Sequence, residues 1–388
     1  MTAADPAPDV VVIGAGIIGA ACALYAARAG FSVTVVDSGT ILGGTSGAGE
    51  GNLLVSDKEQ GPELDLALRS LELWRSLVDE GLGTGFEYEP KGGLVVAFTD
   101  EDFAALRAFA AGQKNTGVIA EEVEAERLPE LEPHLAPGLA GGYWYPQDSQ
   151  VMPALATAQL VAASGADVRL GTAVTGLLVS GGTVRGVRTT RGDIPARFVV
   201  NAAGAWSEAI AALAGSVLPM QPRRGFVLVT EPLPPWIRHK VYSASYVSEV
   251  ASGDAALQSS AVIEGTPSGP VLIGASRELV GLDRTPSYPA LGRLAAQAAE
   301  LFPFLERVSV QRYYCGFRPF LPDHLPAVGP DANIAGLFHA CGHEGAGIGL
   351  APATGELIAA LLAGEKPALD AGPFQPARFE TRREETQG

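Results

Sequence analysis

The distribution of apolar positions predicts a chain in which strands alternate with helices near both ends. Residues 10–27 form one long apolar run, VVVIGAGIIGAACALYAA. Glycines divide this run into a β-branched strand, a turn and an alanine-rich helix that ends at Gly30. A second strand, FSVTVVD, ends in Asp37. Because the flank before the run holds Asp5 and Asp9 but no Lys or Arg, we expect a soluble, unprocessed chain with no membrane span or signal segment.

The same patterns place further elements along the chain. Amphipathic or apolar helices are predicted at 57–79, 101–116, 152–165, 289–302 and 351–362. Strands are predicted at 168–170, 174–179, 183–189, 197–203, 220–229, 241–250, 271–275 and 336–340, with a hairpin at 87–98 and a loop containing one short helix at 123–137.

This order predicts an α/β fold with an α+β second domain. A Rossmann-like nucleotide-binding domain would be assembled from discontinuous segments, at 1–85, 150–215 and 325–388. An inserted substrate-binding domain, built on an antiparallel sheet, would occupy 86–149 and 216–324.

The turn after the first strand carries a dinucleotide-binding fingerprint. Gly14 permits the tight turn, Gly16 lets a pyrophosphate approach the helix N-terminus, and Gly19 allows close packing of helix on strand. Asp37 lies where an acid accepts from ribose hydroxyls. Since strand, helix, strand and acid occur in order, we predict a bound dinucleotide, with contacts from Gly14, Gly16, Ile17, Ile18, Gly19, Asp37 and Ser38. A glycine-rich turn without a ligand is the alternative.

The dinucleotide is predicted to be FAD. A flavoprotein that uses soluble NAD(P)H usually needs a second fingerprint, and GHEGAGIG at 342–349 has the wrong spacing. The loop GGTSGAGEGNLL at 43–54 is too rich in glycine for regular structure and can wrap a flavin, with contacts from Thr45, Ser46, Gly51, Asn52 and Leu53. The alternative is a flexible surface loop.

Two further segments are predicted to lie at the flavin. The strand at 197–203 runs into small residues that let a backbone pass close to a planar ligand, although a simple packing point is an equal alternative. Near the C-terminus, a strand, the glycine-rich turn and a helix recur, so a helix N-terminus faces a ligand. The expected contacts are Val174, Ala203, Gly204, Trp206, Gly345, Ala346, Gly347, Ile348 and Gly349.

Composition excludes several kinds of partner. The 388 residues carry a formal net charge of −16, so the surface repels nucleic acid and anionic lipid. Three cysteines without a CxxC pair give no disulfide framework and no zinc or iron–sulfur site, and they suit a cytoplasmic location. Small molecules and protein partners remain as ligands, and no metal is expected.

The motifs occur in an order that resembles a known family. The glycine fingerprint, TSGAGEGNLL, NAAGAW, CGFRPFLPD and GHEGAGIGLAPATG look like the glycine/D-amino-acid oxidase (DAO-type) family of FAD-dependent amine oxidoreductases, which includes sarcosine oxidase. GASRELVG at 274–281 and the GHEGAGIGLA turn are closest to the D-hydroxyproline dehydrogenase and hydrogen-cyanide-synthase-like branch, whose flavin subunits often work with other subunits.

The resemblance assigns roles to several residues. Arg318 in GFRP matches the arginine that binds the substrate carboxylate, which a guanidinium can hold with two parallel hydrogen bonds. A structural ion pair with Asp323 or Glu344 is the alternative. His343 and Tyr246 are candidate substrate contacts, and Cys315 lies near the column where sarcosine oxidases attach FAD covalently. The second arginine of glycine oxidases is replaced by Gly345, which gives room to a bulkier amino acid.

The implied reaction is hydride transfer from the Cα of a small amino acid to flavin N5, which gives an imine. The substrate would be a D-amino acid or a secondary amine such as proline, hydroxyproline or an N-alkyl amino acid. No lysine lies in the strand at 271–275, where we would expect an oxygen-activating one, so a dehydrogenase with a protein electron acceptor is favoured. The alternatives are an oxygen-using sarcosine or glycine-type oxidase, a 2-hydroxy-acid oxidoreductase, and a flavin subunit active only within a hetero-oligomeric complex. A homo-oligomer is the alternative to electron-acceptor subunits as partners.

Overall fold

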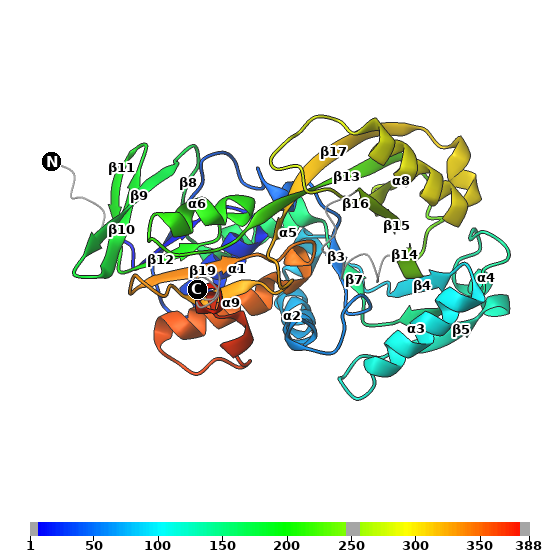
Figure 1. Cartoon of the computed structure of the whole chain (residues 1–388), viewed down its shortest axis with the longest axis horizontal. Coiled ribbons are helices and arrows are strands. Elements are labelled where there is room, and N and C mark those ends of the chain that lie inside the picture. The colour runs from blue at the N-terminus through cyan, green and yellow to red at the C-terminus, as the bar shows by residue number, and fades with distance from the viewer. Residues whose placement is uncertain (1–6, 246–256, 381–388) are drawn as a thin grey trace, which may run out of the picture. The chain divides into compact units, whose positions relative to one another are not determined.

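The computed structural model describes residues 7–245 and 257–380 and divides the chain into two compact units. The first unit combines residues 1–47, 153–221 and 318–388, and the second combines 48–152 and 222–317. Each unit has its own sheets and helices (Figure 1). They are described separately below.

A six-stranded sheet in the order β18-β19-β12-β1-β2-β8 forms the centre of the first unit. All neighbours are parallel except β18, which is antiparallel to β19. The strands are β1 (Val10–Ile13), β2 (Val33–Val36), β8 (Asp167–Arg169), β12 (Phe198–Asn201), β18 (Ala327–Pro330) and β19 (Leu337–Cys341). Because β1, β2, β12 and β19 run the same way, the turns that follow them lie at one edge of the sheet.

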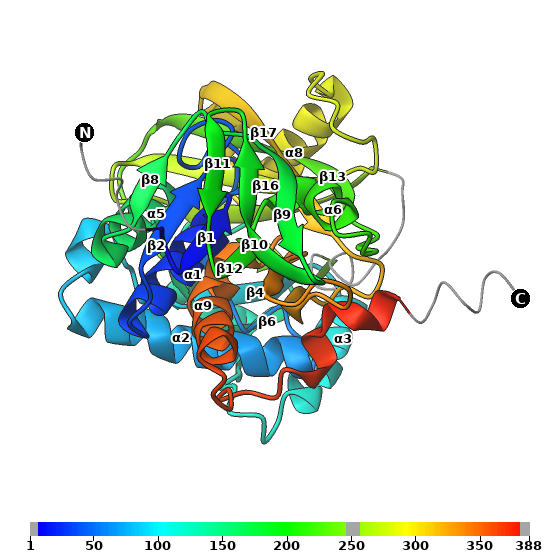
Figure 2. The same ribbon diagram turned by 90° about the vertical axis from the view of Figure 1, so that its left-hand side faces the viewer.

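The two faces of this sheet are covered differently, which explains its continuous apolar strands. Helix α1 (Ile17–Arg28) packs against α5 (Pro153–Ser164) and α9 (Gly347–Ala363). The contact with α9 is close, because a Cβ on Gly355 would lie 2.6 Å from the carbonyl oxygen of Ala21. On the other face, β1, β2, β12 and β19 share a core with α6 (Ser207–Ala212) and with the antiparallel sheet of β9 (Val174–Ser180), β10 (Thr183–Thr189) and β11 (Gly192–Pro195), seen in Figure 2.

The second unit is built on an eight-stranded sheet in the order β17-β13-β16-β15-β14-β4-β6-β5. The strands are β4 (Gly93–Ala97), β5 (Glu121–Glu124), β6 (Gly141–Tyr145), β13 (Gln221–Pro232), β14 (Lys240–Ser243), β15 (Gln258–Gly265), β16 (Pro270–Arg277) and β17 (Val310–Phe320). A two-stranded sheet pairs β3 (Asn52–Leu53) with β7 (Ser149–Gln150). The helices are α2 (Pro62–Asp79), α3 (Asp100–Gly112), α4 (Leu128–Leu131) and α8 (Tyr288–Leu301).

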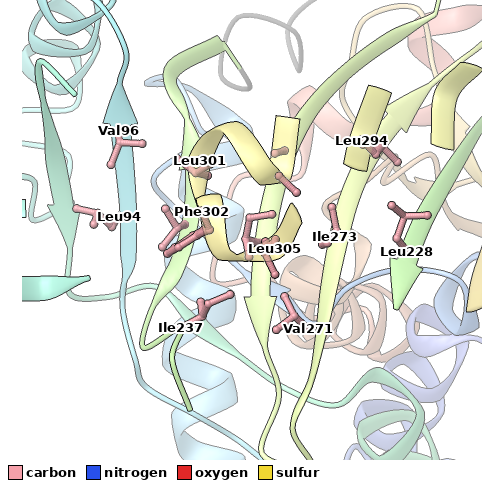
Figure 3. Packing of buried hydrophobic residues seen from close by; sticks show 14 of the residues in the cluster. Leu94, Val96, Leu228, Ile237, Val271, Ile273, Leu294, Leu301, Phe302 and Leu305 are labelled. Carbon is pink, nitrogen blue, oxygen red and sulfur yellow. The ribbon is translucent and has the colours of Figure 1, made fainter. Parts of the chain in front are cut away.

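Alternation along these strands separates two apolar cores. Figure 3 shows one of them, where Leu301, Phe302 and Leu305 pack in one cluster with Val271 and Ile273 of β16. The opposite side of the strands holds a second cluster, in which Phe103 and Leu106 of α3 pack with Val95, Tyr143, Tyr145, Tyr242 and Val262. Short 3₁₀ helices occur at Thr45–Gly47, Gly83–Gly85, Ala125–Arg127, Gly204–Trp206, Pro303–Arg307, Gly372–Phe374 and Pro376–Phe379.

The predicted fold class is confirmed, since a parallel α/β unit made of separated segments accompanies a unit built on a mostly antiparallel sheet. The compact units differ from the predicted domain boundaries mainly at 48–85, which belong to the second unit, and at 318–324, which belong to the first. The predicted hairpin at 87–98 is wrong, because β4 pairs with β6 and β14 instead. Which unit carries which function stays a prediction.

Candidate functional site

The turn between β1 and α1 has the geometry of a phosphate-binding turn. Gly14 has a φ of +113°, and a Cβ there would lie 2.4 Å from the carbonyl oxygen of Ala202. A Cβ on Gly19 would lie 1.9 Å from the Gly14 oxygen. Gly16 is the N-cap of α1, has no side chain to cap the helix, and is followed by Ile17, whose N–H donates to Ser46 Oγ at 3.1 Å. This helix end therefore suits an anion, and the residues present fit the pyrophosphate of FAD.

Asp37 lies at the end of β2, directly beside this turn. Its Oδ2 accepts from Ala15 N–H at 2.8 Å and its Oδ1 accepts from Gly39 N–H at 2.7 Å. Each carboxylate oxygen can accept a further bond, so the ribose contact predicted for Asp37 is compatible with this geometry. Ser38 is exposed next to it, and Ile18 lies half-buried in the first turn of α1. The fingerprint thus folds into one connected structure.

Two other predicted segments meet in the first unit. A Cβ on Gly204 would lie 3.9 Å from Thr45 Oγ1, and a Cβ on Gly44 would lie 3.1 Å from the Trp206 ring. The NAAGAW turn and the first half of the glycine-rich loop therefore lie against each other. Ala203 precedes Gly204 in this turn, and Val174 begins β9 on the core of the same unit.

The second half of the glycine-rich loop belongs to the second unit. A Cβ on Gly51 would lie 1.7 Å from the oxygen of Val151, so only glycine fits between β3 and its neighbour. Gly51 N–H donates to Glu264 Oε2 at 3.2 Å, and Leu53 is fully buried. Asn52 Oδ1 is buried and accepts no hydrogen bond within the described part of the chain, so it fits a ligand that donates one.

The C-terminal glycine-rich turn leads directly into a helix. Helix α9 begins at Gly347, four residues before the predicted start, and its N-cap Ala346 offers no side-chain cap. Gly345, Ala346, Gly347, Ile348 and Gly349 therefore form the last turn and the first helical turn. Partial positive charge at such an end favours a nearby anion, which agrees with the predicted role beside a flavin.

Arg318 lies against this turn. A Cβ on Gly345 would lie 3.3 Å from Arg318 Nε and 3.5 Å from its Cδ, so position 345 is directly beside the guanidinium stem. Of the two acids considered as structural partners, Asp323 Oδ2 accepts from Arg378 Nε at 2.8 Å and Glu344 Oε2 lies 3.3 Å from His324 Nδ1. A structural ion pair between Arg318 and one of these acids stays the alternative.

His343 lies in the turn that precedes α9. Its ring is buried, and Nε2 lies 2.9 Å from Thr354 Oγ1 on α9. The Thr354 hydroxyl donates to Leu350 O, so it accepts from a protonated His343 Nε2. Burial lowers the pKa of His343 to about 3, and the ring is neutral. In this geometry His343 joins the turn to α9, and its contact with substrate stays a prediction.

Two other predicted site residues have different outcomes. Tyr246 lies outside the described residues. Cys315 packs against the core beneath α8, and burial raises the pKa of its thiol. Since side chains alternate along β17, Cys315 and Arg318 point to opposite faces of that strand. A thioether needs a thiolate at the flavin, and neither observation favours one.

Buried charges in the second unit were not anticipated from the sequence. Lys240 on β14 donates to Glu264 on β15, and both are fully buried. Asp148 accepts from Val55 N–H at 2.8 Å and from Ser56 Oγ. Single charges inside apolar strands, as in AVIEG and HKVY, were the available signal. Within the described ranges, no group of three His, Cys, Asp or Glu side chains is placed to hold a metal, and no helix is both long and apolar enough to cross a membrane.

Known proteins with similar sequences support the family that the motifs predict. A family model described as DAO, FAD dependent oxidoreductase, matches residues 9–361. The chain is 30% identical to hydrogen cyanide synthase subunit HcnC of Pseudomonas aeruginosa, covering 96% of both chains. It is also 30% identical to a glycine oxidase of Pseudomonas putida, covering 95% of this chain and 98% of that one.

Solved structures agree with the sequence relatives. L-proline dehydrogenase from P. horikoshii superposes with a TM-score of 0.87 at 28% identity, covering 96% of this chain and 98% of that one. Glycine oxidase from Geobacillus kaustophilus gives 0.86 at 30% identity, with the same coverage. From its motifs, its fold and these similarities, the chain belongs to the DAO family of FAD-dependent oxidoreductases.

Proposed function

We propose that this enzyme dehydrogenates the Cα–N bond of a small amino acid whose carboxylate is bound by Arg318. The observation that carries the proposal is the position of Arg318 beside Gly345, at the turn that begins α9. A guanidinium can hold a carboxylate through two parallel, charge-assisted hydrogen bonds, which fix the rotation of the amino acid.

Gly345 supports a substrate larger than glycine. By its resemblance to glycine oxidases, position 345 looks like the position of their second arginine, and as a glycine it places no side chain next to Arg318 Nε. L-proline dehydrogenase is among the similar structures, so we favour a secondary amine such as proline or hydroxyproline, an N-alkyl amino acid, or a D-amino acid.

The residues proposed to hold FAD come from the turns described above. The N-terminus of α1 would receive the pyrophosphate, Asp37 the ribose, and the NAAGAW and α9 turns the flavin. Bound FAD supplies a hydride acceptor, by which the amine of the substrate is oxidised to an imine. Hydride loss from a neutral amine needs no protein base, so we assign none.

A protein electron acceptor is the second part of the proposal. HcnC is itself named as a subunit, and the strand β16, where an oxygen-activating lysine would be expected, contains none. Lys240, on the neighbouring part of the sheet, is neutralised by Glu264. We therefore favour a dehydrogenase that passes electrons to a partner subunit over an oxygen-using oxidase.

Anaerobic flavin bleaching tests this function. The purified holoenzyme is mixed under argon with D-amino acids, proline derivatives and N-methyl amino acids, and with the matching 2-hydroxy acids. We expect loss of the oxidised flavin absorbance with at least one amino acid and slow reoxidation in air. Bleaching by hydroxy acids alone would assign the other reaction, and fast peroxide formation in air would assign an oxidase.

A further inference from the structure

A buried hydrogen-bonded chain links three elements of the first unit behind the NAAGAW turn. Asn201, the last residue of β12, lies beside His339 of β19 in the parallel sheet. His339 Nε2 lies 2.8 Å from Asp331 Oδ2, and both side chains are fully buried. Asn201 Nδ2 lies 3.1 Å from His339 Nδ1 and is equally buried.

Backbone groups at both ends fix the direction of this chain. Asn201 Nδ2 lies 2.9 Å from Ser207 O, which can only accept, so the amide nitrogen must face it. Its second hydrogen then points at His339 Nδ1, which must carry no proton. At the other end, Asp331 Oδ1 accepts from Asn333 N–H at 2.9 Å and from Ile334 N–H at 2.8 Å.

These constraints leave one protonation state for the chain. His339 is neutral with its proton on Nε2, which donates to the Asp331 carboxylate. Burial acts to raise the pKa of Asp331, but the hydrogen bonds from His339, Ser216 and the two backbone N–H groups together hold that pKa below its usual value. Asp331 thus sets the tautomer of His339, and His339 sets the orientation of the Asn201 amide.

The orientation of Asn201 bears directly on the turn that follows it. Asn201 Oδ1 accepts from Ala203 N–H at 3.3 Å, while Nδ2 holds Ser207 O. The amide therefore bonds to the backbone on both sides of Gly204, which has a left-handed φ of +56°, and holds the turn in this conformation. If the amide were rotated by half a turn, its oxygen would face the carbonyl oxygen of Ser207, and its NH₂ group would face the N–H of Ala203. Neither pair can form a hydrogen bond.

We propose that Asp331 and His339 are positioning residues for the FAD site, acting through Asn201 on the turn Ala203–Trp206. The inference rests on the proposed placement of this turn at FAD, and it depends on no property of the substrate. A histidine held between a carboxylate and an amide specifies one arrangement of the turn, much as outer hydrogen bonds orient metal ligands.

The tautomer of His339 tests the chain without any change to the wild-type protein. In holoenzyme labelled with ¹⁵N-histidine, five ring systems are present, and that of His339 is identified by its absence in H339N. We expect a bare Nδ1 and a protonated Nε2 at pH 7. A proton on Nδ1, or a charged ring, would overturn the proposed chain whatever the substrate is.

The variant D331N tests the link to FAD. The substituted amide keeps the size of the side chain and can still accept from Asn333 N–H and Ile334 N–H, but it donates to His339 and reverses the tautomer. We expect about tenfold weaker FAD binding when the apoprotein is titrated and flavin fluorescence is followed. The matched control is D193N, the same substitution at an exposed carboxylate of β11 in the same unit, which should keep FAD affinity within about twofold of the wild type.

A second variant changes Asn201 itself, and thermal midpoints separate its effect on FAD binding from a folding defect. N201D replaces the donor that faces Ser207 O, and it should also weaken FAD binding about tenfold while His339 gains a proton on Nδ1. Thermal midpoints of the apoproteins are measured alongside. A reversed tautomer in D331N, with FAD affinity within about twofold of the wild type, would contradict the positioning role even if amino-acid oxidation is confirmed.

Discussion

The two units of the chain place their polar groups in opposite ways. In the first unit, the groups assigned to the site lie at the ends of parallel strands, where Gly14, Asp37 and Gly345 meet turns and helix N-termini. In the second unit, charged groups lie within the sheet itself, where Lys240 pairs with Glu264. Strand ends form a site from local motifs, whereas a charge inside a sheet depends on pairing between distant segments.

The largest expected effect comes from removing Arg318, the proposed carboxylate-binding residue of the first unit. R318L removes both hydrogen bonds to the substrate carboxylate, each worth about 1.5–3 kcal/mol, so kcat/KM should fall by about 10²–10⁴. Anaerobic stopped-flow flavin reduction measures it. The variant R318K keeps the charge but cannot form the two parallel hydrogen bonds, so its kcat/KM should lie between those of the wild type and R318L. Unchanged reduction in R318L with full FAD content would remove Arg318 from the site.

The next largest effect is expected at Gly14, and Gly30, which also has a positive φ, provides the comparison. G14A places a Cβ 2.4 Å from the Ala202 oxygen, so we expect loss of bound FAD and a large fall in thermal midpoint. Gly30 has a φ of +90° with nothing within 4 Å of its Cβ position, so G30A should cost only about 1 kcal/mol. Equal flavin-to-protein ratios in the two variants would show that the close approach to β12 is unimportant.

Asp148 tests the buried charges of the second unit. Burial raises the pKa of Asp148 to about 7, well above its unfolded value near 3.8. A raised carboxyl pKa means that stability is lost as pH rises from about 4 to 7, by roughly 4 kcal/mol in full. The neutral variant D148N should therefore gain stability relative to the wild type between pH 4 and pH 8. If the thermal midpoints of the wild type and D148N change with pH by the same amount, Asp148 is not the group responsible.

His343 gives the opposite pH dependence in the first unit. Because burial lowers the pKa of His343 to about 3, the folded state resists protonation that the unfolded chain accepts below about 6.5. The wild type should lose roughly 2 kcal/mol by pH 5, and H343Q should not show this loss. Melting curves at pH 7 and pH 5 provide the measurement, and a loss of equal size in H343Q would show that another group is responsible.

The smallest expected effect concerns Cys315. Its thiol packs into the apolar core beneath α8 and has a raised pKa, so FAD should not be attached to it. Acid precipitation should release the yellow colour into the supernatant, equally from the wild type and C315S. Colour that stays in the wild-type pellet and disappears from that of C315S would restore the covalent link.

The same contrast explains what the sequence could predict. The fingerprint, Asp37 and the first two strands form over short separations, and the structure confirms β1, α1 and β2. The helix at the C-terminal turn was predicted to start at Ala351 because glycines usually interrupt helices, yet α9 begins at Gly347. Helix α9 therefore includes Gly347 and Gly349, which the sequence pattern assigned to the turn.

The second unit was harder to predict because its sheet joins distant residues. Strand β4 lies between β6 and β14, so no local pattern could reveal that residues 87–98 form no hairpin. Strand β17, which carries Cys315 and Arg318, was not predicted as a strand. Its alternation decides which of these two side chains faces the glycine-rich turn, and that information exists only once the strand is formed.

The most direct test of the central claim compares one amino acid with its amide. The holoenzyme is mixed under argon with the amino acid that bleaches its flavin and, separately, with the corresponding amino-acid amide, which keeps the Cα–N bond but lacks the carboxylate. If Arg318 binds the carboxylate, the amino acid reduces the flavin about a hundredfold faster than the amide, or more. Equal rates for the two compounds in the wild type would contradict the account.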